Sequence, residues 1–499
     1  MGMSEPWLNE RVTWTGHWWL PGSPDESHAG FLTYDPESGL ELTLVGGFED
    51  RIIRQDGPSA FAVLEGSRTW EVLHGVADNR EVTLLDCLAT HSQSFGLGFE
   101  GPDKQTVRAQ TALIGVHLET PADAVFLEAR TVIEDLWHWT AQGGLSASMT
   151  LDAEGKHPTG EGKIIVAPVE KHEVMVDGTM IGLHHYLTLP NYSHERRGTM
   201  GYVRDTAVLS VTPDLPSSLR DLNELIHSMQ DLVSLAVHRG AAVLWVQFFL
   251  PPSDRDRPEV YPVRPRRVDV YQRRQVVGDP VGRSVDEHEV LFTLADLPYE
   301  DIVPRWFKLR KQFGATCNML LGMRYLEGGY METQLITIAA AAEALHEELP
   351  HQPPIPPLEF AALRQTLIDA VPVERIQWIK NVISNRPSLR TRLDALAARL
   401  PTSVAEKLLP DAGEWAKRTA RARNDLSHAG KSKQPIDDMY AVVEVTKAVV
   451  LLNLLLELGL TEEKLVEALN DNNELRHACQ LALRHLVSEH LSGPGQVDG

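Results

Sequence analysis

The chain has few cysteines, and they lie far apart. Among 499 residues there are only 3, Cys87, Cys317 and Cys479. None belongs to a Cys-x-x-Cys pair, which argues against a disulfide framework or a zinc ribbon. This cysteine usage fits a reducing compartment, and the first residues lack the basic and apolar regions of a signal peptide. We therefore expect a cytoplasmic protein without a metal.

Long apolar runs are also absent. The longest, residues 448–456, contains Asn453 and falls well short of the roughly 18 residues that suggest a membrane span. It predicts a buried helix, and we expect no membrane partner. With 43% hydrophobic and 23% charged residues, the composition is that of an ordinary globular protein. At 499 residues the chain is too long for one hydrophobic core, so two or three domains are expected.

Positive charge is scarce as well. The chain has 47 Lys and Arg against 69 Asp and Glu, a net charge of −22. Such a balance disfavours a nucleic-acid partner, because phosphate binding depends on clustered cations. Residues 361–434, however, hold 14 Lys and Arg against 7 Asp and Glu. On this count alone, solvated helix faces explain the basic segment at least as well as a binding patch.

The N-terminal part of the chain has the pattern of a β-rich domain. Residues 31–34 and 40–45 alternate apolar and polar positions around the turn sequence at 35–39, which predicts a hairpin. Further short strands are expected up to about residue 211, and again at 242–250 and 268–277. They predict a sandwich or barrel. Helices are expected near 124–139 and 217–238, within a domain that spans 1–292.

Tryptophans are frequent at the start of this domain. Trp14, Trp18 and Trp19 lie in or beside an expected strand. They could form a platform for a sugar or a nucleotide, but aromatic side chains in strands are far more often part of the core. We favour the core.

Beyond residue 292 the apolar positions follow a helical period. Helices are expected at 303–312, 332–349, 358–370, 373–382, 389–400, 404–409, 414–428, 437–458 and 462–487, with Gly or Pro in several connections. The expected fold is therefore α+β and multidomain: a β-rich region, an all-α bundle over 293–490, and a flexible tail over 491–499.

One segment of this bundle carries the residues needed to cut RNA without a metal. The sequence Arg423-Asn-Asp-Leu-Ser-His428 offers an arginine for phosphate charge and a histidine for proton transfer. On a helix, Asn424 and His428 lie one above the other, whereas Arg423 lies roughly 140° around from His428. Gly430 is a natural helix end, which puts His428 in the last turn, where the helix dipole favours a cation.

Basic residues surround this segment. Lys417, Arg418, Arg421 and Lys431 are candidates for contacts with the RNA backbone. The spacing itself is not specific, because Arg283 and His288 share it in a segment with no helical pattern. Judged on residues alone, an ion-pairing helix end explains the segment as well as catalysis does.

A family resemblance adds to this interpretation. The Arg-Asn-Asp-Leu-Ser-His segment, the alanine-rich run at 338–345 and the apolar helix at 440–458 together resemble a HEPN domain of the ApeA-like group. Residues 18–22, 30–33, 40–46 and 230–235 are similar to the N-terminal domain of ApeA anti-phage proteins.

The resemblance implies a defence protein of the abortive-infection type. Its HEPN domain is expected to be an endoribonuclease that uses neither metal nor cofactor, cleaves by attack of the 2′-hydroxyl, and pairs as a homodimer. RNA is the expected partner, with transfer RNA as one candidate, and a phage-derived trigger is expected to act on the N-terminal region. Arg423 and His428 would be the catalytic pair, and Asn424 would support them. Glu343 either orients Arg423 or is an ordinary exposed helix glutamate.

Two other interpretations stay open. The HEPN domain could bind a nucleotide or RNA without cutting it, as a non-catalytic interaction module. Alternatively, the β-rich region could bind a carbohydrate or another small ligand and have a function of its own.

Overall fold

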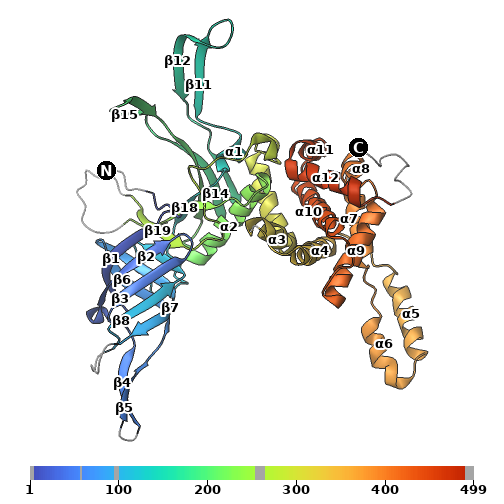
Figure 1. The fold of residues 1–499 in the computed structure, drawn as a ribbon, viewed down its shortest axis with the longest axis horizontal. Coiled ribbons are helices and arrows are strands. Elements are labelled where there is room, and N and C mark those ends of the chain that lie inside the picture. The colour runs from blue at the N-terminus through green and yellow to red at the C-terminus, as the bar shows by residue number, and fades with distance from the viewer. Residues whose placement is uncertain (1–4, 57–58, 95–100, 253–263, 327, 489–499) are drawn as a thin grey trace. The chain divides into compact units, whose positions relative to one another are not determined.

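The computed structural model describes residues 5–56, 59–94, 101–252, 264–326 and 328–488 (Figure 1). The chain forms two compact units, Met1–Val285 with Thr293–Pro304, and Asp286–Phe292 with Arg305–Gly499. The boundary expected at 292/293 falls in the stretch where the chain passes between these units. The expected tail, 491–499, lies outside the described residues.

The first unit is β-rich. Its strands are β1 (Val12–Trp19), β2 (His28–Asp35), β3 (Gly39–Val45), β4 (Asp50–Asp56), β5 (Ser59–Glu65), β6 (Thr69–Ala77), β7 (Arg80–Gln93), β8 (Lys104–Ala109), β9 (Thr111–Ile114), β10 (Glu128–Ile133), β11 (Leu145–Leu151), β12 (Pro158–Val166), β13 (His172–Val176), β14 (Thr179–Leu187), β15 (Asn191–Glu195), β16 (Gly198–Tyr202), β17 (Asp205–Pro213), β18 (Val243–Leu250) and β19 (Arg266–Gln272). It also holds the helices α1 (Leu136–Thr140) and α2 (Leu219–Ala236) and the 3-10 turn Pro24–Glu26.

A 13-stranded antiparallel sheet runs through this unit in the order β13-β14-β17-β10-β18-β19-β9-β7-β6-β1-β2-β3-β8. Because β7 also pairs with β8, the part from β7 to β8 closes into a barrel of six strands. Closure removes the open edges that such strands would otherwise present. The β-rich prediction is confirmed, and of its two forms the barrel, extended by further strands, is the one observed.

The hairpin expected at 31–45 shows how the sequence builds the barrel. Asp35 pairs with Gly39 across the turn, and its carboxylate accepts hydrogen bonds from the backbone amides of Glu37 and Ser38, both at 3.0 Å. Gly39 has a φ of +86°, which suits glycine. Leu32 and Leu42, on the inner face, are fully buried. Apolar and polar residues alternate along these strands because successive side chains point to the core and to the surface in turn.

The prediction of a helix at 124–139 is wrong. This segment forms strand β10, paired with β17 on one side and β18 on the other, followed by the five-residue α1. Ala129 and Thr131 are fully buried. The Thr131 hydroxyl donates to the Trp245 carbonyl at 2.8 Å. Tertiary pairing on both sides thus overrides a local pattern that fits a helix. The other expected helix is confirmed as α2, whose N-cap Ser218 accepts from the Asp221 amide.

Two hairpins, β11–β12 and β15–β16, extend away from the sheet (Figure 1). Every side chain of β11 is exposed. Asp205 ties the bases of both hairpins together, because its carboxylate accepts from the Gly144 amide at 2.6 Å and contacts His185 Nδ1 at 2.9 Å. These hairpins have little core of their own, so their position depends on such anchors.

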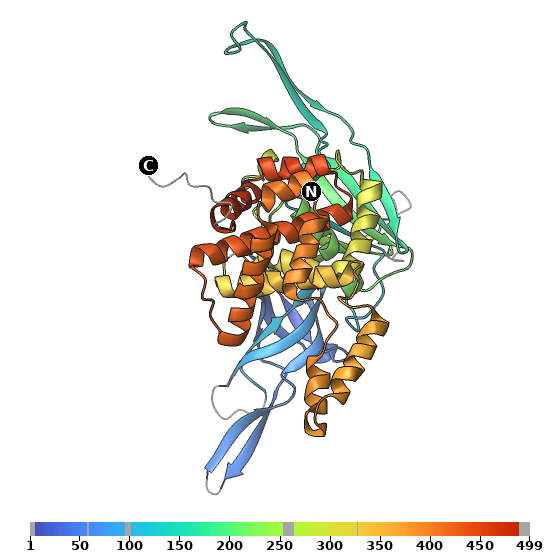
Figure 2. The same cartoon turned by 90° about the vertical axis from the view of Figure 1, so that its right-hand side faces the viewer.

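The second unit is helical, as expected. Its helices are α3 (Tyr299–Tyr325, whose first residues belong to the β-rich unit), α4 (Met331–Glu348), α5 (Pro357–Asp369), α6 (Ile376–Val382), α7 (Leu389–Arg399), α8 (Thr402–Leu408), α9 (Ala412–Ala429), α10 (Ile436–Leu458), α11 (Glu462–Asp471) and α12 (Asn473–His485). The 3-10 turns Glu287–Glu289 and Val373–Arg375 also belong to it. Helices α5 and α6 project from the bundle in both views (Figure 2).

Helix α10 is the centre of the bundle and packs against α4, α7, α9 and α12. It is long and apolar enough to cross a membrane, but 78% of its most apolar 18-residue stretch is buried, as in a core helix. The single helix expected over 462–487 is two helices. Asn472 ends α11 and caps α12, accepting from the Leu475 amide at 3.1 Å. An asparagine in a polar run favours such a cap over a helix interior.

Candidate active site on helix α9

Helix α9 has the start, the buried stripe and the end that its sequence predicts. The Asp411 carboxylate caps it, accepting from the Glu414 amide at 2.9 Å. Trp415, Thr419, Ala422 and Leu426 form its buried face, at the spacing of an amphipathic helix. Gly430, with a φ of +69°, ends it, and His428 therefore lies in the last turn. The opposite face carries the polar residues of the motif.

Arg423 is held from the neighbouring helix. Its Nη2 lies 3.0 Å from Oε1 and 3.4 Å from Oε2 of Glu343 on α4. Its Nη1 donates to the side-chain oxygen of Asn424 at 3.3 Å. The two charged side chains are 34% and 31% exposed, so the pair lies at the surface and an incoming anion can reach the guanidinium. Glu343 is therefore paired, and is not an isolated exposed glutamate.

A second arginine fixes the helix end that carries Glu343. Arg392, near the start of α7, donates to the backbone carbonyl of Glu343 at 3.2 Å and forms an ion pair with Glu347 at 2.8 Å. Its hydrogen bond is the main reason that the pKa of Glu347 is lowered. The Arg392 side chain is only 11% exposed. The sequence interpretation missed this residue, although a charge directly before the buried Leu393 signals that a partner is needed.

Asn424 and His428 are both exposed and share one face of α9. Among the described residues, His428 has no hydrogen bond or ion pair, so its ring is available to a ligand. In particular, no hydrogen bond joins it to Arg423.

The four basic neighbours divide into two kinds. Lys417 forms an ion pair with Glu414 at 2.9 Å. Arg418 contacts the same carboxylate at 2.9 Å and also Asp438 of α10 at 2.8 Å. These two cations are therefore occupied within the bundle.

Arg421 and Lys431 differ from them. Both are exposed, and neither forms an ion pair within the described residues. They leave positive charge at the end of α9 that carries His428.

Family models match both parts of the chain. The ApeA N-terminal domain 1 matches residues 13–306, and the Apea-like HEPN domain matches residues 336–464. The chain belongs to the ApeA family. No curated protein and no solved structure matches the chain. The HEPN match contains α7, α9 and the part of α4 from residue 336 onward, and therefore Glu343, Arg392, Arg423 and His428. The family is one of anti-phage defence, and its HEPN module is of the nuclease type.

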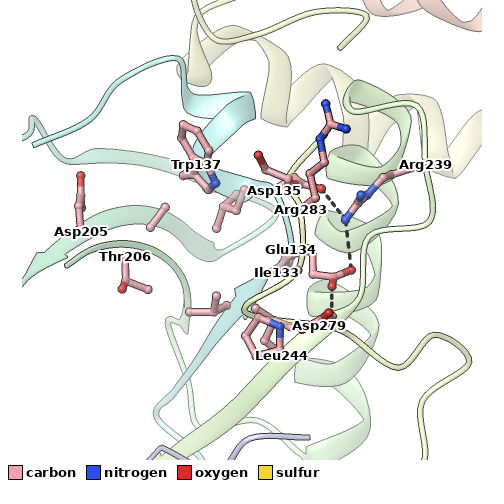
Figure 3. Close-up of a pocket in the computed structure, with 16 residues that line it drawn as sticks. Ile133, Glu134, Asp135, Trp137, Asp205, Thr206, Arg239, Leu244, Asp279 and Arg283 are labelled. Atoms are coloured by element: carbon pink, nitrogen blue, oxygen red, sulfur yellow. Dashed lines mark hydrogen bonds and ion pairs between the residues drawn. The ribbon is translucent and has the colours of Figure 1, made fainter. Parts of the chain in front are cut away.

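The ApeA N-terminal domain contains a cavity of about 150 Å³, lined by both apolar and charged residues (Figure 3). Its acids are used within the protein. Glu134 accepts from the backbone amides of Asp279 and Ala242, at 2.7 and 3.0 Å, and Asp135 pairs with Arg239 at 2.9 Å. These contacts hold loops to the sheet, so we assign this cavity a structural role. In the part of the chain that the structure describes, no group of three or more His, Cys, Asp or Glu could hold a metal ion.

Proposed function

We propose that this ApeA-family chain is a metal-independent endoribonuclease that acts in abortive-infection defence against phage. One observation carries the proposal: Arg423, oriented by Glu343, and His428, exposed in the last turn, lie on the same helix end. Arginine gives planar, bidentate donors to phosphate, and histidine titrates near neutral pH.

The chemistry uses these groups directly. A base takes the proton from the 2′-hydroxyl, the O2′–P bond forms, and the P–O5′ bond breaks while the 5′-oxygen gains a proton. His428 is the proposed group for proton transfer, and Arg423 stabilises the charge on the phosphate oxygens. Asn424 supports the arginine through its side-chain oxygen. The products are a 2′,3′-cyclic phosphate and a 5′-hydroxyl.

We propose further that the active enzyme is a homodimer. The reaction needs two proton transfers, and one chain offers only His428 for them. Arg423 and His428 also lie roughly 140° apart around the helix, so a single chain has no second proton-transfer group beside its arginine. A second copy that presents its own motif would supply it. The resemblance to paired HEPN domains supports this arrangement.

RNA, with transfer RNA as the candidate class, is the proposed substrate, in the cytoplasm. Arg421 and Lys431, exposed and outside any ion pair among the described residues, are the proposed backbone contacts. Lys417 and Arg418, which are paired with Glu414, would act on RNA only through their contribution to the electrostatic field. The β-rich unit is proposed to restrain the nuclease until it meets a phage-derived trigger.

The test is cleavage of total cellular RNA by purified protein, with and without EDTA, followed by mapping of the ends. His428→Ala should reduce cleavage at least about 100-fold, because a lost general acid or base costs roughly 10²–10⁴ in rate. His288→Ala is the matched control, since His288 shares the Arg-x-x-x-x-His spacing but lies outside any α-helix. Its activity should equal that of the wild type.

Full activity in His428→Ala would sink the proposal, and loss of activity in EDTA would count against its mechanism. If neither the wild type nor Arg423→Ala cleaves RNA and both bind it equally, the HEPN unit is a non-catalytic binding module instead.

A further inference from the structure

The ApeA N-terminal unit holds a second, larger cavity, of about 350 Å³. It lies between the segment 5–12 and the strands β1, β7 and β19. The segment is fixed over the sheet: the Leu8 amide donates to the Leu244 carbonyl at 2.8 Å, and the Tyr34 hydroxyl donates to the Leu8 carbonyl at 2.8 Å. The cavity is therefore a built feature of this unit, and its size falls within the range of small-molecule sites.

Aromatic rings form its apolar wall. Trp7 comes from the overlying segment, Trp14 from β1 and Tyr271 from β19. Trp14 and Tyr271 meet edge to face, with ring centroids 4.8 Å apart. Trp18, four residues beyond Trp14, is fully buried in the core. Trp14 is only 7% exposed and belongs to the core as well, as the sequence predicts, so the half-buried Trp7 is the ring that a ligand can contact.

Rigid hydrogen-bond donors stand beside this wall. Asp269 on β19 has a side chain only 6% exposed, and it accepts from Arg80 Nη1 at 2.8 Å and from Arg267 Nε at 2.6 Å. Arg80 also donates to the Ile114 carbonyl at 2.7 Å. Because these contacts fix the guanidinium plane of Arg80, the directions of its N–H groups are set. Burial raises the pKa of Tyr271, so its hydroxyl stays protonated.

Acceptors complete the lining. Glu5 and Glu10, both exposed, come from the overlying segment. With two arginines against three carboxylates, the lining has a slight negative charge, which disfavours a ligand with several phosphates. A neutral planar ring with donors and acceptors on its edge is the chemistry that matches. Arginine contacts ring nitrogens and carbonyls of bases, carboxylates accept from their amino groups, and aromatic side chains stack on them.

We propose that this cavity binds a nucleobase, presented by a free nucleoside or by an unpaired position of an RNA. The base lies against Trp7, its acceptors face Arg80, and its amino group faces Glu10. This site is separate from the one on α9, and it goes beyond the nuclease function, because nothing in it depends on cleavage.

The full-length protein should be titrated calorimetrically with the four nucleosides and with a short single-stranded oligonucleotide in which every 2′-hydroxyl is methylated. Trp7→Ala should weaken binding at least about fivefold, since base stacking on an aromatic side chain is worth roughly that or more. Trp137→Ala is the matched control, because Trp137 is an exposed tryptophan of the same unit outside this cavity. It should bind as the wild type does.

Glu10→Gln is a second variant, chosen because Glu10 is exposed and its loss should leave the fold intact. It should lower the affinity for bases with an amino group more than the affinity for uridine. Binding of nucleosides indicates a free ligand, and binding of the oligonucleotide alone indicates an RNA base; either supports the proposal if Trp7→Ala reduces it.

Three results would overturn it. The wild type could bind no nucleoside or oligonucleotide at millimolar concentration. It could bind glucose or N-acetylglucosamine in preference to nucleosides. Finally, binding could be unchanged in Trp7→Ala and lost in Arg423→Ala, which would place the bound base on the HEPN unit.

Discussion

Both units hold arginines beside carboxylates, yet they do so in opposite ways. In the β-rich unit, Arg80 and Arg267 share Asp269, whose side chain is 6% exposed. In the helical unit, Arg423 and Glu343 are 34% and 31% exposed. A buried carboxylate with two cationic partners fixes geometry, whereas an exposed pair can exchange its partner for a phosphate at little cost. The difference separates an ion-pair cluster of fixed geometry from an ion pair that an anion can open.

The largest effect should come from removing the buried carboxylate. Asp269→Ala leaves two guanidiniums close together without a counter-charge, and we expect a loss of about 3 kcal/mol in the stability of the β-rich unit. Glu343→Ala should cost less than about 1 kcal/mol in the helical unit. Hydrogen exchange at increasing denaturant, followed in peptides of β18, β19 and α4, measures each unit separately. Equal losses in the two variants would remove the contrast between buried and exposed pairs.

A smaller effect tests the role of the exposed ion pair between Arg423 and Glu343. Glu343→Gln keeps the size and an acceptor but loses the charge that orients Arg423, so we expect RNA cleavage to fall roughly tenfold through kcat, with KM unchanged. The matched control is Glu348→Gln, an exposed glutamate in the last turn of α4. Cleavage by that variant should stay near the wild-type rate. If both variants lose activity to the same extent, these carboxylates support activity only by keeping the end of α4 folded, and not by orienting Arg423.

The sequence predicts the local parts of the fold well and the distant ones poorly. Helix α9 carries its signals within 20 residues: an acidic cap, an apolar stripe and Gly430. Strand β10 does not, because its identity depends on pairing with β17 and β18, which lie far along the chain. A segment whose pattern fits both structures is decided by its partners.

The same limit applies to the two sites. The Arg423 motif is contiguous and could be found, and Glu343 could be proposed because it is the single charge in an alanine run. The ion pair of Arg80 with Asp269 joins residues 189 positions apart, so no local pattern indicates it. Arg418 and Arg421 look alike in the sequence. Only the fold shows that Asp438 occupies the first of them.

The smallest predicted effect concerns Glu414, which holds Lys417 and Arg418 beside the candidate active site. Its pKa is lowered from 4.5, first by the hydrogen bond from Lys417 and further by Arg418. A carboxyl with a lowered folded pKa stabilises the fold above its ordinary pKa, and that contribution disappears as the pH falls through the lowered value. Glu414→Gln should therefore cost roughly 0.5–1 kcal/mol at pH 7 and progressively less as the pH falls below 4.5. Glu406→Gln, an exposed glutamate of α8, is the control and should show no such dependence. If Glu414→Gln costs as much at pH 3 as at pH 7, packing rather than charge fixes these cations.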